Sequence, residues 1–253
     1  YYPSPATFAS SVIDSGTARS HFDRFRRLQH GERSLLDEIV AQIPAPPIQP
    51  AAAPRGAATR RLSAALSQRH GPTRVIAEIK RRSPSAGTIA EIPDPGALAM
   101  QYVKQGAAAI SVLTNGAHFA GSLDDLRAVR RAVDVPVLRK DFVIDPGQLD
   151  EAVEAGADAV LLIVSVLGRG LAQMLKLATS LGLEALVEVH DRDELQFALD
   201  AGALIIGINN RDLRSFGVDL GTSETLAPLV TGNRIVVAES GIRSNDDLNR
   251  LRK

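Results

Sequence analysis

The chain contains no cysteine and no excess of either charge. Without cysteine it forms neither disulfides nor thiolate metal sites, and it suits a reducing compartment. The 29 basic residues balance 29 acidic ones, so the composition indicates no long-range attraction to nucleic acid or to an anionic membrane. The five histidines lack metal-ligand spacing and no H-E-x-x-H occurs. We therefore expect no metal, no nucleic acid and no membrane as partners.

Long apolar runs and nucleotide-binding loops are also missing. The most apolar stretch, 157–167, is far shorter than the roughly 20 residues that span a bilayer. The first residues lack the charged-then-apolar order of a signal peptide, so we expect a cytoplasmic protein. Neither G-x-G-x-x-G after the first predicted strand nor G-x-x-x-x-G-K-[ST] occurs, which disfavours an open nucleotide-binding sheet.

From about residue 75 the chain alternates apolar segments of strand length with helical patterns. Strands that are buried on both faces have continuous apolar sequence, as in a parallel sheet covered by helices. The predicted strands are 75–80, 108–113, 135–139, 158–164, 184–189, 204–208 and 234–239. The predicted helices are 95–105, 123–132, 146–155, 171–181, 192–201 and 223–230. At 253 residues, and with charged groups at strand ends, this α/β pattern favours a (βα)8 TIM barrel over a doubly wound sheet.

Only seven strands are predicted, although this barrel needs eight. The sequence ends at Lys253, inside the helix after the seventh strand. We therefore expect that the eighth βα unit is missing and that the natural gene encodes it. The first and seventh strands would then keep open edges, so we expect the 253-residue chain to be poorly soluble or nearly inactive.

Residues 1–74 differ from the rest of the chain. Helical patterns at 22–40 and 58–68 flank a Pro/Ala-rich segment, 43–55, that has the composition of an extended linker. This region lacks the apolar content for a core of its own. We expect a helical extension, 1–74, laid against a barrel that comprises 75–253.

Ionisable groups end several of the apolar strands. Glu78 and Lys80 are two residues apart, so they share one face of their strand, while Lys140, Glu188 and Glu239 end other strands. Such groups are costly to bury without a partner or a function, and several at one end of a sheet indicate an active site. The alternatives are a structural ion pair for the first two residues and a surface position for the lysine of the third strand.

Three polar loops also follow strands. Ser83-Pro84-Ser85-Ala86-Gly87 and Ser240-Gly241 are small, and their hydroxyl and backbone N–H groups could hold a phosphate, although serine–glycine turns are common. The segment Asn209-Asn210-Arg211-Asp212 could orient substrate hydroxyls or simply form a turn.

Together these segments closely resemble the indole-3-glycerol-phosphate synthase family of tryptophan biosynthesis. The matching motifs are E-I-K-R-x-S-P-S at 78–85, R-K-D-F at 139–142 and N-N-R-D at 209–212, and the resemblance extends from about residue 75 to the end. It implies ring closure on 1-(2-carboxyphenylamino)-1-deoxyribulose 5-phosphate with loss of CO₂ and water. It implies no cofactor, and it suggests other tryptophan-pathway enzymes as candidate partners.

The resemblance also implies roles for individual residues. Lys140 would be the general acid that activates the ribulose carbonyl, and Glu188 the base or proton shuttle of the later dehydration. Lys80 would hold the departing carboxylate, while Glu78 and Asn209 would orient the hydroxyls and lysines. The remaining implied residues are Ser240 in the catalytic set, Ser83, Gly241 and Arg211 at the phosphate, Phe119 and Phe142 against the aromatic ring, and Arg81 as a further substrate contact.

Two other functions compete with this one. A related barrel isomerase, such as a phosphoribosylanthranilate isomerase, would be expected to use a Cys/Asp pair, which a chain without cysteine does not have. A non-catalytic, truncated barrel that binds phosphate ligands agrees with the missing eighth strand. The complete set of strand-end charges argues against it.

Overall fold

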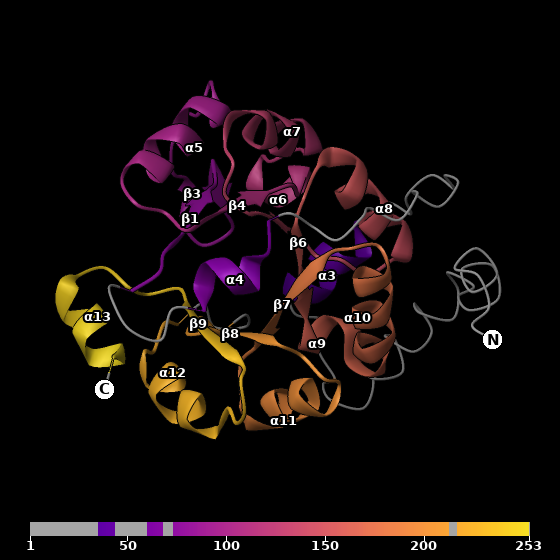
Figure 1. Cartoon of the computed structure of the whole chain (residues 1–253), viewed down its shortest axis with the longest axis vertical. Coiled ribbons are helices and arrows are strands. Elements are labelled where there is room, and N and C mark those ends of the chain that lie inside the picture. Colours follow the sequence, from indigo (N-terminus) through magenta and orange to yellow (C-terminus); the bar gives the residue numbers. More distant parts are fainter. Residues whose placement is uncertain (1–34, 44–59, 68–72, 213–216, 253) are drawn as a thin grey trace.

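The computed structural model describes residues 35–43, 60–67, 73–212 and 217–252. Its main feature is a curled sheet of seven parallel strands, arranged in chain order (Figure 1). The strands are β1 (Ile76–Ile79), β4 (Ala109–Leu113), β5 (Val137–Lys140), β6 (Ala159–Ile163), β7 (Glu184–Val189), β8 (Ile205–Asn209) and β9 (Ile235–Glu239). All seven predicted strands are present, each within two residues of its predicted bounds.

Helices follow the strands and cover the outside of the curled sheet (Figure 1). The longer ones are α5 (Pro95–Lys104), α7 (Leu123–Ala132), α8 (Pro146–Ala155), α10 (Leu171–Ser180), α11 (Arg192–Asp200), α12 (Gly221–Leu226) and α13 (Asn245–Leu251). Short elements that were not predicted are the hairpin β2 (Arg82–Ser83) and β3 (Gly87–Thr88), α6 (Gly116–Phe119), α9 (Val164–Leu167) and the 3₁₀ turn η1 (Gly168–Gly170). The predicted helix 223–230 is divided between α12 and the 3₁₀ turn η2 (Ala227–Leu229). Several helices begin at a capping side chain, such as Asp94 before α5 and Ser122 before α7.

The sheet is an incomplete barrel. β1 and β9 form its two edges, and no strand in the described ranges pairs with either edge from the open side. The fold class is thus an α/β curled parallel sheet of seven strands, while an eighth βα unit stays a prediction. Among the described residues, no helix is both long and apolar enough to cross a membrane.

Apolar side chains pack on both faces of the sheet, which explains the continuous apolar sequence of its strands. On the outer face, Val112 and Val160 pack in the cluster that joins the sheet to the helices. On the inner face, Leu138, Leu161 and Leu186 form a second cluster. The side chains therefore alternate between the helix layer and the barrel interior.

Two short helices from the N-terminal region contribute to the inner cluster. They are α3 (Leu35–Ala41) and α4 (Leu62–Leu66), and the fully buried Leu62 packs in that cluster. Ser63 donates from its backbone N and its Oγ to Glu184, the first residue of β7, at 2.9 and 2.5 Å. α4 thus lies at the amino-terminal end of the sheet. Most of the predicted helix 22–40, the ends of 58–68 and nearly all of the linker 43–55 lie outside the described residues, and the division at residue 74 stays a prediction.

Asp158 ties neighbouring βα units together at this same end of the sheet. Its Oδ2 accepts from the backbone N of Val137, at 3.0 Å, and from Nη1 of Arg130, at 2.6 Å. The Asp158 side chain is 5% exposed. A buried carboxylate with two donors thereby joins the start of β5, the end of α7 and the segment before β6.

We expect Asp158→Ala to lower the free energy of unfolding by about 3–5 kcal/mol, because it leaves a buried cation and a backbone N–H without their partner. Urea denaturation measures this loss. The matched control is Asp134→Ala, because Asp134 is fully exposed and pairs with Arg60 only at 3.5 Å. A loss for Asp158→Ala no larger than that of the control would contradict the role of this carboxylate.

Candidate active site

The polar groups at the carboxyl ends of the strands line one open cavity of about 1750 Å³. It contains all six residues of the predicted catalytic set: Glu78, Lys80, Lys140, Glu188, Asn209 and Ser240. It also contains five residues of the predicted substrate-binding set: Ser83, Arg211, Gly241, Phe119 and Phe142. Ile76 and Val236 line it too, so the cavity continues into the opening between β1 and β9 and is larger than the site itself.

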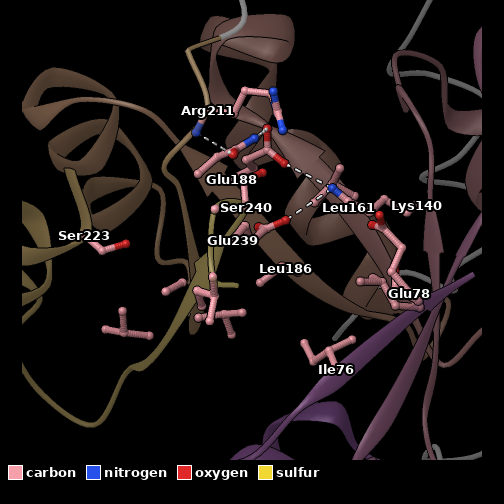
Figure 2. Close-up of a pocket in the computed structure, with 18 of the residues that line it drawn as sticks. Ile76, Glu78, Lys140, Leu161, Leu186, Glu188, Arg211, Ser223, Glu239 and Ser240 are labelled. Atoms are coloured by element: carbon pink, nitrogen blue, oxygen red, sulfur yellow. Dashed lines mark hydrogen bonds and ion pairs between the residues drawn. The ribbon is translucent and has the colours of Figure 1, made fainter. Parts of the chain in front are cut away.

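Lys140, at the end of β5, is the centre of the site (Figure 2). Its Nζ lies 3.2 Å from Oε2 of Glu239 and 3.6 Å from Oε2 of Glu188. Burial alone would lower the pKa of Lys140, but the carboxylates of Glu239, Glu188 and Glu78 outweigh it and raise that pKa strongly. Lys140 therefore carries its proton in the free protein, as a general acid must.

Glu188 is the most deeply buried carboxylate of the site, with a side chain 3% exposed. Its Oε1 accepts from Nδ2 of Asn209 at 3.1 Å and lies 3.2 Å from Nε2 of His190. Burial would raise the pKa of Glu188, but Lys140, His190 and Asn209 together lower it to about 2. Glu188 is therefore ionised and able to accept a proton.

Glu239 ends β9, as Glu188 nearly ends β7; it was counted among the strand-end charges of the sequence but was assigned no individual role. One oxygen, Oε2, hydrogen-bonds to Lys140, while Oε1 is buried and has no hydrogen-bond partner among the described residues. Burial raises the pKa of Glu239 to about 7, although Lys140 opposes the rise. The two carboxyl groups beside the lysine thus differ in pKa, because only Glu188 has further hydrogen-bond and charge partners, Asn209 and His190.

His190 was not predicted to belong to the site. Its Nδ1 lies 3.0 Å from Oε2 of Glu194, and its Nε2 faces Glu188. Burial would lower the pKa of His190, but the two carboxylates raise it to about 10. Nδ1 hydrogen-bonds to Glu194, whereas Nε2 lies near Glu188 without a hydrogen bond, so the charges of the two carboxylates favour the protonated ring and His190 is a second cation beside Glu188.

We expect this protonated histidine to make stability depend on pH. Because the folded-state pKa of His190 is raised from 6.5 to about 10, its contribution is complete below pH 6.5 and is lost as the pH rises toward 10. The free energy of unfolding should therefore fall over that range in the native chain, and fall less in His190→Gln. Urea denaturation from pH 6 to pH 10 measures both curves. Parallel curves would show that His190 is neutral.

Glu78 and Lys80 lie on and just after β1, and they form an ion pair. Their side chains are 29% and 30% exposed, and both line the cavity. Unlike Lys140, Lys80 therefore has a face open to an incoming ligand. A partly exposed lysine at this position suits the binding of a substrate anion.

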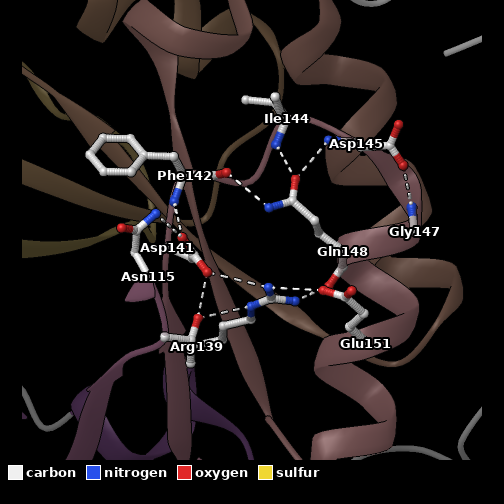
Figure 3. Close-up of polar contacts among 10 residues, drawn as sticks. Asn115, Arg139, Asp141, Phe142, Ile144, Asp145, Gly147, Gln148 and Glu151 are labelled. Carbon is white, nitrogen blue, oxygen red and sulfur yellow. Dashed lines mark hydrogen bonds and ion pairs between the residues drawn. The ribbon is translucent and has the colours of Figure 1, made fainter. Parts of the chain in front are cut away.

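The segment after β5 is held by a buried network (Figure 3). The carboxylate of Asp141 accepts from Thr114 Oγ1 at 2.6 Å and from Arg139 Nη2 at 3.3 Å, and its Oδ1 accepts from the backbone N of Phe142. The side chain of Gln148 in α8 donates to the carbonyl oxygen of Phe142 at 3.0 Å. The network fixes the backbone directly after Lys140.

An aromatic pair stands over one side of the cavity. The rings of Phe119 and Phe142 have centroids 6.3 Å apart and an interplanar angle of 40°. Both side chains line the cavity. The two rings thus form an apolar part of the cavity wall, a surface that suits contact with a flat aromatic ligand.

The loop after β9 has an unusual backbone. Ser240 and Gly241 both have positive φ, 65° and 82°. A Cβ at Gly241 would also lie 2.4 Å from Cγ1 of Val218, so only glycine fits. Asn210 Nδ2 donates to the carbonyl oxygens of Glu239 and Ser240, at 3.0 and 3.2 Å, and thereby fixes this turn at the cavity.

The other predicted phosphate loop is the β2–β3 hairpin. Its Ser83 Oγ accepts a hydrogen bond from the backbone N of Ala86 at 3.2 Å, within the turn between β2 and β3. Arg211 follows β8, and its backbone N donates to Oδ1 of Asn209 at 3.0 Å. Both Ser83 and Arg211 lie along the cavity wall.

Arg81 is the one predicted site residue that the structure does not bring to this cavity. Its guanidinium contacts Asp125 of α7, with Nη1 at 2.5 Å from Oδ2 and Nη2 at 3.0 Å from Oδ1. It also donates to the carbonyl oxygen of Ile92 at 2.8 Å. Arg81 follows Lys80 directly, so in an extended chain its side chain leaves on the opposite face. The geometry supports a structural contact rather than a substrate contact.

Comparisons of the sequence with known proteins point to one family, and a solved structure shares the fold. The family model for indole-3-glycerol phosphate synthase matches residues 27–253. The chain is 50% identical to such a synthase from Kineococcus radiotolerans over 220 residues, which cover 85% of this chain and 76% of the relative. It is 44% identical to one from Dehalococcoides mccartyi over 233 residues, 90% of this chain and 85% of the relative. A structure of an N-acetylmannosamine-6-phosphate 2-epimerase from Clostridium perfringens shares the fold, with a TM-score of 0.53, 16% identity, and coverage of 70% of this chain and 81% of that one.

Proposed function

We propose, from the premise that this chain belongs to the indole-3-glycerol phosphate synthase family, that the groups around Lys140 perform the acid–base steps of that reaction. The family reaction closes an indole ring on a phosphorylated substrate, 1-(2-carboxyphenylamino)-1-deoxyribulose 5-phosphate, and releases CO₂ and water. The observation that carries the proposal is the ammonium of Lys140 between the carboxylates of Glu188 and Glu239 at the mouth of the barrel.

Lys140 acts as the general acid on the ribulose carbonyl oxygen. Three carboxylates hold its proton in the free protein, so it becomes a useful acid only when the surrounding negative charge falls. Of Glu188 and Glu239, Glu239 has the pKa nearer neutrality and takes up a proton more readily. Protonation of Glu239 lowers the pKa of Lys140 and favours proton transfer to the substrate.

Glu188 then serves as the base for the dehydration. While Lys140 is protonated, the pKa of Glu188 stays low and Glu188 is a weak base. Once Lys140 has given up its proton, only the positive charge of His190 remains beside Glu188, and the pKa of Glu188 rises. Proton transfer from Lys140 therefore makes Glu188 a stronger base for the later dehydration.

The rest of the cavity places the substrate around these two groups. Lys80 lies where it can hold the carboxylate that leaves as CO₂, next to Glu78. The rings of Phe119 and Phe142 lie against the anthranilate ring. The phosphate is held by Ser83, by the turn at Ser240 and Gly241 and by Arg211, which all line the cavity.

A steady-state assay with the anthranilate-linked ribulose phosphate, followed by indole fluorescence, tests this function. Formation of the indole product with release of one CO₂ per turnover is expected, and the rate measured for residues 1–253 also tests the prediction that a chain ending at Lys253 is nearly inactive. Binding without turnover would instead indicate a non-catalytic phosphate-binding barrel. The family match does not favour an isomerase, and association with other tryptophan-pathway enzymes stays a prediction.

A further inference from the structure

One glycine of the barrel wall is neither in a turn nor in a left-handed conformation. Gly207 lies in the middle of β8, buried, and pairs with Glu188 of β7 and Val237 of β9. Glycine inside a strand is unfavourable by about 0.5–1 kcal/mol relative to alanine and marks a place where another group approaches closely. We therefore expect another group to lie too close to position 207 for a side chain to fit.

The group that approaches Gly207 is the carboxylate of Glu239. A Cβ at Gly207 would lie 2.1 Å from Oε1 of Glu239, and 3.2 Å from Cδ1 of Leu186. Any other residue at position 207 would thus overlap with the carboxylate. Gly207 is two residues before Asn209 on the same strand, so both face the barrel interior.

Hydrogen bonds alone do not fix Glu239. Its Oε1 is buried without a hydrogen-bond partner among the described residues, and its Oε2 contacts Lys140 at 3.2 Å. A buried carboxylate oxygen without a donor is costly, so hydrogen bonds do not explain why the Glu239 carboxylate lies here. The carboxylate fits here because Gly207 has no side chain and leaves the space free.

We propose that Gly207 is a positioning residue for the reaction, because its missing side chain provides the recess that sets the Glu239 carboxylate against Lys140. The inference rests on the proposed role of Lys140. Beyond the charged residues of the site, the reaction would then also require a residue without a side chain at position 207.

The test is a double-mutant cycle with Gly207→Ala and Glu239→Ala. Gly207→Ala should lower kcat by about 10- to 100-fold with little change in KM, since misplacing a catalytic group by about 1 Å costs up to this much. In the Glu239→Ala background the same substitution should have almost no further effect, because the recess is then empty. Gly170→Ala is the matched control, since a Cβ there meets no atom within 4 Å and the φ of Gly170 is −74°.

Stability gives a second measurement if Gly207→Ala folds poorly. The double variant should then unfold at a higher denaturant concentration than Gly207→Ala alone, because removing the carboxylate relieves the overlap. Equal losses of kcat from Gly207→Ala in both backgrounds, or native turnover in Gly207→Ala, would overturn the proposal. The native chain in the same assay tests the proposed function separately. If the native chain is inactive, the proposed function fails, but the double-mutant cycle of Gly207 and Glu239 can still be measured by denaturant unfolding.

Discussion

Replacing Lys140 with alanine is expected to lower kcat by about 10²–10⁴-fold while KM changes little, the loss typical of a missing general acid. The reason is geometric, since Lys140 is the cation within 4 Å of both Glu188 and Glu239 at the mouth of the barrel. Steady-state kinetics with indole fluorescence measures both constants.

The control for this prediction is Lys104→Ala, because Lys104 is an exposed lysine at the end of α5. Removing Lys140 also leaves Glu188 and Glu239 without the cation between them, so we expect the pKa of both carboxyl groups to rise and unfolding to become easier above neutral pH. Near-native turnover in Lys140→Ala would remove it from the acid role. Lys80 would then be the next candidate, since it is the other lysine that lines the cavity.

The strand-end charges could be predicted because an ionised side chain in an apolar strand is expensive unless it has a partner. This argument identified Lys140 and Glu188, and parallel strands place all such ends on one side. It could not identify the pairing of Lys140 with Glu239, because β5 and β9 are not neighbours in the sheet. Their ends meet only because the sheet curls, and the amount of curl is not encoded in any local pattern.

Arg81 and His190 depart from the sequence-based interpretation for different reasons. Arg81 was predicted to contact the substrate from a motif, whereas the alternation that places Glu78 and Lys80 on one face sends Arg81 toward α7, and its role at the substrate stays a prediction. His190 could not be predicted, since a histidine two residues after Glu188 has many possible partners, and its second one, Glu194, comes from the next helix.

Replacing Glu188 with glutamine should separate the two halves of the reaction. The change keeps the size of the side chain and an oxygen that can accept from Asn209, but removes the charge and the ability to take a proton. We expect kcat to fall by about 10²–10⁴-fold, as for a missing general base. Because Lys140 remains, ring closure and decarboxylation should proceed and dehydration should stop.

A single-turnover experiment with carboxyl-labelled substrate distinguishes these steps. In Glu188→Gln, labelled CO₂ should be released in an amount close to that of the enzyme, well before any indole fluorescence appears. In Lys140→Ala neither signal should appear on that timescale, because the acid acts first. Glu184→Gln is the matched control, since Glu184 begins the same strand at the far end of the barrel and contacts Ser63 rather than Lys140. Simultaneous loss of CO₂ release and indole formation in Glu188→Gln would instead place this carboxylate in the first step, alongside Lys140.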